Sequence, residues 1–125
     1  MKIKLDSWKV QNLTFAISES KEKIKNSFDL STGHYFPELE SNKFCIEFDV
    51  KIKDKKFDLT INALFMFSLD DIVTEQFKIS DFPKINAPAI AFPYLRAFIS
   101  NFTLQSGFKP VMLPSINFVA LANKE

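Results

Sequence analysis

The sequence predicts an α+β fold in which strands come first and one long helix follows. Apolar and polar residues alternate along residues 44–53 and again along 57–67, and a period of two is typical of strands with one buried face. Residues 87–107, "APAIAFPYLRAFISNFTLQSG", then carry apolar side chains around most of a helix, with Arg96 as the single charge. We expect one domain that spans residues 1–125.

Two further strand candidates precede this hairpin. Apolar residues alternate with lysines at residues 3–5 and with polar residues at 13–17. Residues 18–26, "SESKEKIKN", read as a polar crossover to the next strand candidate. That candidate is residues 27–36, "SFDLSTGHYF", in which a glycine limits the regularity of the strand.

The strands at 44–53 and 57–67 are expected to pair as a hairpin, because only a short polar stretch separates them. Its wet face should carry the polar residues, with Cys45 among them. Residues 68–88 lack any alternation and are expected to be irregular. The dry face should consist of Phe44, Ile46, Phe48, Val50, Ile52, Phe57, Leu59, Ile61, Ala63, Phe65 and Phe67.

The helix at 87–107 has recognisable ends and two apolar sides. Pro88 suits its first turn, Gly107 suits the position after its last turn, and Pro93 is expected to kink it or to loosen its start. One side can cover the dry face of the sheet, and the other needs a second surface. A second copy of the chain is the economical answer, and a helix sunk wholly in its own domain is the alternative. The polar stripe of the helix is Arg96, Ser100 and Thr103.

The composition excludes several classes of protein. The net charge is +1, from 16 lysines and arginines against 15 acids, which argues against a general nucleic-acid binder. The single cysteine, Cys45, cannot form an intramolecular disulfide, and the N-terminus lacks the apolar run of a signal peptide, so we expect a cytoplasmic protein. Fifteen phenylalanines against two glycines exceed what a small interior needs, so some should face a partner, another copy or a ligand.

No motif of an enzyme is present. The sequence has no glycine-rich phosphate loop, and His34 with Cys45 cannot supply the spacing of a zinc site. A nucleophile–base pair of these two residues is less ordinary than a small side chain in the middle of a strand. Asp70 and Asp71 are read as loop or cap residues. We therefore expect no catalytic residues, no metal and no cofactor.

Two segments resemble the bacterial protein-export chaperone SecB family. They are "FPYLRAFISNFTLQSGF" at residues 92–108 and "PVMLPSINFVAL" at 110–121, which follow one another in the order and spacing of that family. The resemblance implies a four-stranded antiparallel sheet with a crossover between the first two strands and one long helix packed on one face. It also implies a homotetramer, a dimer of dimers with the long helices between the dimers.

The resemblance further implies an ATP-independent holdase that keeps non-native polypeptides competent for export or folding. Apolar grooves would bind these clients, and no nucleic acid or membrane insertion is expected. On this sequence the implied polypeptide-binding residues are Ile24, Phe28, Leu30, Phe36, Phe67, Leu69, Phe77, Ile79 and Phe82, and the implied oligomer interface is Tyr94, Phe98, Asn101 and Phe102.

Two departures from the family weaken the expectation that the SecA motor is a partner. The sequence ends shortly after "NFVAL", where the family continues into a second helix and a mobile tail. Asn12, Ala16 and Thr60 occupy positions at which the family presents acids, although Glu47 and Asp49 could replace part of that patch. A SecB-like chaperone dedicated to one client such as an antitoxin, a hydrophobic-ligand-binding module, and a structural subunit with one fixed partner remain alternatives.

Overall fold

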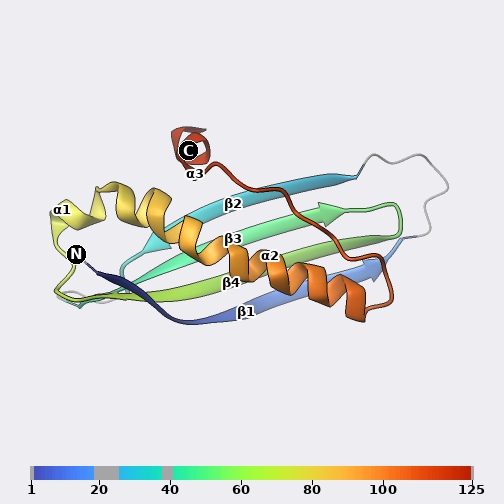
Figure 1. The fold of residues 1–125 in the computed structure, drawn as a ribbon, viewed down its shortest axis with the longest axis horizontal. Helices are drawn as coiled ribbons and strands as arrows, with labels where there is room; N and C mark the ends of the chain where they lie inside the picture. Colours follow the sequence, from blue (N-terminus) through green and yellow to red (C-terminus); the bar gives the residue numbers. More distant parts are fainter. Residues whose placement is uncertain (1, 19–25, 38–40, 125) are drawn as a thin grey trace.

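The computed structural model describes residues 2–18, 26–37 and 41–124. Four strands precede a helical C-terminal part (Figure 1), and the long helix α2 lies across one face of the sheet. The predicted α+β architecture is therefore confirmed. The elements are β1 (Ile3–Ile17), β2 (Ser27–Tyr35), β3 (Lys43–Lys53), β4 (Phe57–Leu69), α1 (Glu75–Lys78), the π-helix η1 (Phe82–Asn86), α2 (Ala87–Gln105) and α3 (Phe118–Lys124).

The sheet is antiparallel throughout, with the strand order β1-β4-β3-β2. The chain therefore crosses from β1 at one edge to β2 at the opposite edge before the β3–β4 hairpin fills the space between them. The register places the alternating apolar residues on a single face, as in the pairs Phe28–Ile52 and Val50–Ile61. All the predicted dry-face residues of β3 and β4 are buried.

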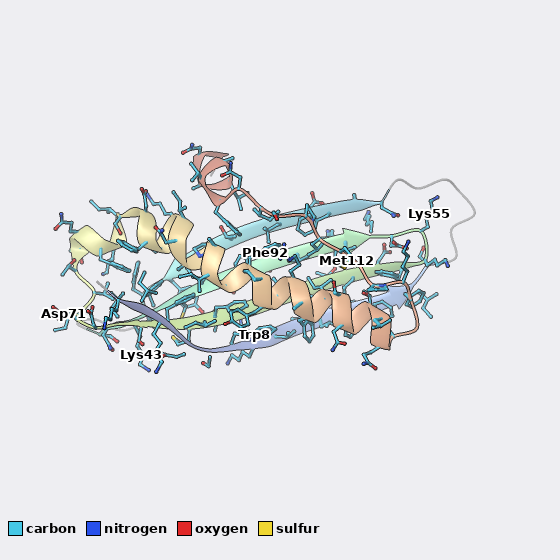
Figure 2. All side chains as sticks on the ribbon, in the orientation of Figure 1. Trp8, Lys43, Lys55, Asp71, Phe92 and Met112 are labelled. Carbon is cyan, nitrogen blue, oxygen red and sulfur yellow. The ribbon has the colours of Figure 1, made fainter. Side chains whose placement is uncertain are left out.

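Strand β1 keeps its apolar side chains on the inner face by means of two bulges. Register shifts fall between Leu5 and Ser7 and between Val10 and Asn12. Each bulge adds one residue to β1, so the inward-facing positions change from odd to even residue numbers at the first bulge and back to odd numbers at the second. Trp8 thereby joins the core, where it stacks on Phe65 with ring centroids 4.9 Å apart, and Figure 2 shows it beneath α2.

Residues 68–88 are more regular than the sequence predicts. Thr74 caps the short helix α1, since its hydroxyl accepts a hydrogen bond from the Phe77 N–H at 3.1 Å. The π-helix η1 then leads directly into α2, with Pro83 in its first turn. Short helices of this kind carry no apolar periodicity of their own, so the alternation test could not detect them.

The C-terminal end of α2 has the geometry that its glycine predicts. Gly107 has φ +94°, and the N–H groups of Gly107 and Phe108 donate to the carbonyls of Leu104 and Thr103. This arrangement is a Schellman motif, and it needs a residue that adopts positive φ at low cost. The chain therefore reverses direction here, and residues 108–116, which we name the return segment, run back toward α3 (Figure 1).

The expected polar stripe of α2 is wrong at Thr103, which is fully buried. Its hydroxyl donates to the Ile99 carbonyl at 2.9 Å and accepts from the Val111 N–H at 3.0 Å. The Ser100 hydroxyl donates to the Val111 carbonyl. Side chains of α2 thus bind both the N–H and the carbonyl of Val111. Ser100 and Thr103 therefore fix the return segment instead of facing water.

Candidate polypeptide-binding groove

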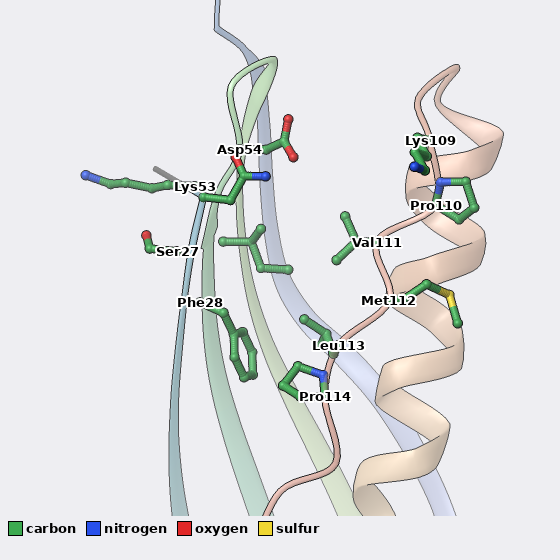
Figure 3. A pocket seen from close by; sticks show the side chains of 12 residues that line it. Ser27, Phe28, Lys53, Asp54, Lys109, Pro110, Val111, Met112, Leu113 and Pro114 are labelled. Atoms are coloured by element: carbon green, nitrogen blue, oxygen red, sulfur yellow. The ribbon is translucent and has the colours of Figure 1, made fainter. Parts of the chain in front are cut away.

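A hollow of about 350 Å³ lies between the start of β2 and the return segment. Phe28 projects from β2 toward Leu113 and Pro114, which form the opposite wall (Figure 3). Ile52 of the neighbouring strand completes the floor. The lining residues are Asn26, Ser27, Phe28, Ile52, Lys53, Asp54, Lys109, Pro110, Val111, Met112, Leu113 and Pro114.

The return segment beside this hollow carries a highly exposed apolar side chain on its α2 side, where Met112 Sδ lies 3.5 Å from the Ser100 hydroxyl oxygen (Figure 3). Met112 is 80% exposed, whereas its neighbour Leu113 is buried in the core. Methionine is flexible and polarisable, and it adapts to apolar partners of different shape. Because Val111 is fixed to α2, Met112 is presented from a rigid support rather than from a free loop.

A second hollow of about 250 Å³ lies farther along the inner face of β2. It is lined by Thr32, His34, Lys84 and Ala122, which come from β2, η1 and α3. Leu30 lies between the two hollows on the same face of the strand. We call the two hollows together the β2 groove. From Phe28 to His34 the strand advances about 20 Å, the length of a six-residue extended peptide.

A cluster of phenylalanines follows at the end of β2. The ring centroid of Phe36 lies 6.2 Å from that of Phe44 and 6.5 Å from that of Phe77. Phe77 in turn stacks on Phe82, with ring centroids 5.9 Å apart. The Lys78 ammonium lies 5.3 Å from the ring centre of Phe36, a cation–π contact. Phe36 and Phe82 are half-buried, so the cluster presents some aromatic surface beside the groove.

The residues expected to bind polypeptide fall into distinct environments. Phe28, Leu30, Phe36 and Phe82 are half-buried along the groove and the cluster, and Ile79 is 76% exposed. By contrast, Phe67, Leu69 and Phe77 are buried in the core of the protomer, so they support the surface from beneath while the protomer keeps this packing. Ile24 lies outside the described residues.

The return segment is the part of the groove that the sequence reasoning missed. The prolines at 110 and 114 did indicate an extended segment, but nothing in the sequence placed it opposite Phe28. Its position follows from the Schellman turn at Gly107 and from the hydrogen bonds that Ser100 and Thr103 make to Val111. The sequence carried no signal of this position, because only the tertiary structure shows that Thr103 is buried beneath the return segment.

The outer side of α2 carries a stripe of exposed residues with alternating spacings of four and three. Tyr94 is 52% exposed and Leu104 is 55% exposed, so a helix wholly sunk in its own domain is ruled out. This spacing is the one at which helices pack side by side. The stripe consists of Ile90, Tyr94, Ala97, Asn101 and Leu104.

Two of the expected interface residues are tied to the protomer's own sheet. Phe98 makes an edge contact with Trp8 at 5.8 Å, and Phe102 makes one with Phe15 at 5.3 Å. Both are half-buried. They flank the exposed stripe and help to seat α2 on β1.

Cys45 and His34 lie on opposite faces of the sheet, since His34 pairs with Ile46 and Tyr35 with Cys45. A nucleophile–base pair between them is thereby excluded. Cys45 lies on the outer face of the sheet, as expected, but it does not face water, because it is only 1% exposed. Its Sγ lies 3.4 Å from Sδ of Met66 on the next strand. Met66 and Tyr35 flank the thiol in neighbouring strands.

We expect Cys45 to react slowly with thiol reagents in the native protein. Burial raises the pKa of its thiol, and the reactive thiolate is correspondingly scarce. Because the thiol pKa is higher in the native state than in the unfolded chain, its contribution to native stability is fully present below the unfolded pKa. This contribution is lost as the pH rises through the native pKa. Maleimide labelling at pH 8, followed by mass spectrometry, should be at least about tenfold slower than in denaturant. Equal rates would contradict the buried position, and Cys45→Ser gives the unlabelled baseline.

No group of three or more His, Cys, Asp and Glu side chains that could hold a metal occurs in the part of the chain that the structure describes. Within residues 2–18, 26–37 and 41–124, no helix is both long enough and apolar enough to cross a membrane.

Asp71 accepts a hydrogen bond from the Ile72 N–H at 2.7 Å, as a loop residue does.

Together these features define an α+β protein with an open apolar groove beside an edge strand. A model of the SecB family, described as preprotein translocase subunit SecB, matches residues 7–125. The chain belongs to the SecB family. Members of this family are protein-export chaperones and not enzymes, so the predicted family and the predicted lack of enzymatic activity are both confirmed.

The chain also matches individual proteins over most of the length of each. The chain is 32% identical over 117 residues to the protein-export protein SecB of Rickettsia akari, which covers 90% of this chain and 74% of that protein. It is 28% identical over 127 residues to an uncharacterized protein of Methanocaldococcus jannaschii, covering 95% of this chain and 81% of the other.

Solved structures share the fold. A SecB-like chaperone of Mycobacterium tuberculosis, solved with a ChAD peptide from the HigA1 antitoxin, superposes with a TM-score of 0.70 at 11% identity, over 91% of this chain and 87% of that one. A protein of unknown function from Streptococcus agalactiae gives a TM-score of 0.54 at 11% identity, over 91% and 98% of the two chains.

Proposed function

We propose that this protein is an ATP-independent holdase that binds non-native polypeptides in the β2 groove. The observation that carries the proposal is the open apolar hollow between Phe28 on β2 and Leu113 and Pro114 of the return segment, with the highly exposed Met112 beside it on the same rigidly held segment. An unfolded client exposes apolar side chains, and burying them against such walls is favourable without any reading of sequence.

The backbone of β2 offers a second means of binding. β2 is an edge strand, hydrogen-bonded to β3 on one side, so its other edge can pair with an extended client. The client would then place alternate side chains over the inner face, where Phe28, Leu30 and the second hollow lie. This mode needs neither a nucleotide nor a cofactor.

The working unit in this proposal is a homotetramer, a dimer of dimers, of a single-domain protein that acts in the cytoplasm. The exposed stripe of α2 is the surface that a second subunit would cover, with Tyr94 and Asn101 at its centre and Phe98 and Phe102 at its flanks. Several grooves on one oligomer would engage one long client, which raises avidity without any new contact.

A narrower version of this function is a chaperone dedicated to one client. The Mycobacterium tuberculosis structure, with its bound antitoxin peptide, supports this version. A SecA partnership has weaker support, because the outer face of the sheet presents Asn12, Ala16 and Thr60 as neutral exposed residues. Asp49 on the same face accepts a hydrogen bond from Asn62 at 2.8 Å.

Replacing Met112 by serine is expected to weaken the binding of an unfolded client without destabilising the protomer. The side chain is mostly exposed, so its loss removes little of the core, while its contact with a client should be worth at least a fivefold change in Kd. Fluorescence anisotropy with a labelled, reduced and unfolded protein measures this. The double variant Phe28→Ser and Leu30→Ser should weaken binding further and leave the native mass unchanged.

Ile17→Ser is the matched control, because Ile17 is 68% exposed on the inner face of the opposite edge strand. It should bind clients as the unaltered protein does. Equal affinity of Met112→Ser and the unaltered protein would mean that Met112 does not contact the client, and equal affinity of the Phe28 and Leu30 variant would contradict the groove. Loss of assembly in the Phe28 and Leu30 variant would mean that these residues serve the fold instead.

A further inference from the structure

Beyond the β2 groove, at the β3–β4 turn, lies an adjoining hollow of about 200 Å³, which we name the end hollow. It shares Asn26, Asp54 and Lys109 with the first hollow of the groove. Its floor is apolar, since Phe57 and Phe108 contact each other there with ring centroids 5.0 Å apart. A client that runs along β2 past Phe28 would therefore enter the end hollow next.

The walls of the end hollow are cationic. Lys55, Lys56 and Lys109 line it, and all three are exposed. None of these lysines forms an ion pair with a residue that the structure describes. Figure 2 shows Lys55 at this end of the molecule, far from Asp71 at the other end.

The single described acid in the lining is already engaged. Oδ1 of Asp54 accepts a hydrogen bond from the Lys56 N–H at 2.9 Å and so closes the turn. Lys53 and Asp58 also lie at this end, and they face each other across the outer side of the sheet. Among the described side chains that line the end hollow, the charged groups are therefore three ammonium groups and one carboxylate.

We propose that the β2 groove prefers client segments in which an apolar stretch is flanked by acidic residues, and that the end hollow takes the acidic flank. This inference rests on the proposed holdase function and names its client class. The apolar stretch would cover Phe28 and Leu30, and the carboxylates would lie among Lys55, Lys56 and Lys109. Three lysines that form no ion pair with any described residue, above an apolar floor, complement carboxylates that are attached to an apolar chain.

The second hollow of the groove agrees with this preference. Lys84 is exposed there beside Thr32 and Ala122, and no acid lines that hollow among the described residues. Farther along, the Lys78 ammonium is paired with Glu75 at 3.2 Å, and Asp81 lies exposed at the start of η1. The cationic excess is therefore concentrated along the groove and at its turn end.

Two series of three labelled peptides test the proposal. They share one central apolar sequence and carry three glutamates, three glutamines or three lysines, on the N-terminal side in one series and on the C-terminal side in another. At low salt the best glutamate peptide should bind about tenfold more tightly than its lysine counterpart, because three exposed charge contacts each change sign. The difference should shrink to about twofold or less at 0.5 M salt, where the charges are screened.

A charge-reversal variant assigns the effect to the end hollow. Lys55→Glu with Lys109→Glu should abolish or reverse the preference for the glutamate peptide. Lys4→Glu with Lys43→Glu changes the net charge equally on the outer face of the sheet and should retain the preference. Equal binding of all peptides, or a preference that both variants lose alike, would overturn the inference. If none of the peptides bound at all, the proposed holdase function itself would fail.

Discussion

Replacing both Tyr94 and Leu104 by aspartate is expected to break the oligomer into smaller species. Both side chains are more than half exposed in the protomer, so the substitutions should leave the fold of the subunit intact. In an assembly that packs α2 against another α2, the same positions become buried, and unpaired carboxylates there are costly. We expect the dissociation constant of that contact to rise at least about 100-fold.

Analytical ultracentrifugation over a range of concentrations measures this change. Val119→Asp is the control, because Val119 is comparably exposed on α3, away from the α2 stripe. A double variant with the mass of the unaltered protein would contradict the proposed interface. Phe98→Asp is a less clean probe, since Phe98 also contacts Trp8 within the protomer.

Phe48→Ala is expected to have the largest effect on stability. The ring is fully buried and contacts Phe65, Phe92 and Phe118, which belong to β4, α2 and α3. Its removal leaves a cavity where the sheet, the long helix and the C-terminal helix meet, and such a change costs about 3–5 kcal/mol. The total free energy of unfolding of a domain of this size is only about 5–15 kcal/mol.

Urea denaturation followed by circular dichroism measures the loss. Phe48→Leu, which keeps most of the volume, should cost less than about 1.5 kcal/mol. If the alanine and leucine variants were equally stable, Phe48 would not hold the three elements together. The alanine variant should also lose client binding, because α3 forms part of the second hollow of the groove.

The parts of the fold with a strong periodic pattern were predictable from sequence. Strict alternation gave β3 and β4 and their buried face, and the long apolar run with Gly107 gave α2 and its end. In β1 the search for alternation missed Trp8, because each bulge adds a residue and so shifts the inward-facing positions by one. α1 and η1 were missed because each is too short to show a period.

The burial of single polar residues was not predictable in the same way. Cys45 follows the polar parity of β3, yet Met66 and Tyr35 on neighbouring strands cover it. Thr103 belongs by helical spacing to a polar stripe, yet the return segment lies over it. In both cases the covering residues are distant in sequence, so only the tertiary structure reveals the burial.

The candidate site was predictable on one wall only. Phe28 and Leu30 follow from the apolar face of β2, whereas Met112 and the end hollow depend on how residues 108–116 fold back over the sheet. Client binding, the interface and the acidic preference are each tested by a variant of their own. The holdase function is the central one, because the interface and the acidic preference both serve it.

The most direct test of the holdase function is size-exclusion chromatography with light scattering, run with and without one equivalent of a reduced, unfolded protein. We predict a peak of about 58 kDa, four times the 14.4 kDa chain, whose mass increases by that of the unfolded protein when the two are mixed. A peak near 14 kDa that does not change in the presence of the unfolded protein would contradict both the tetramer and the holdase function.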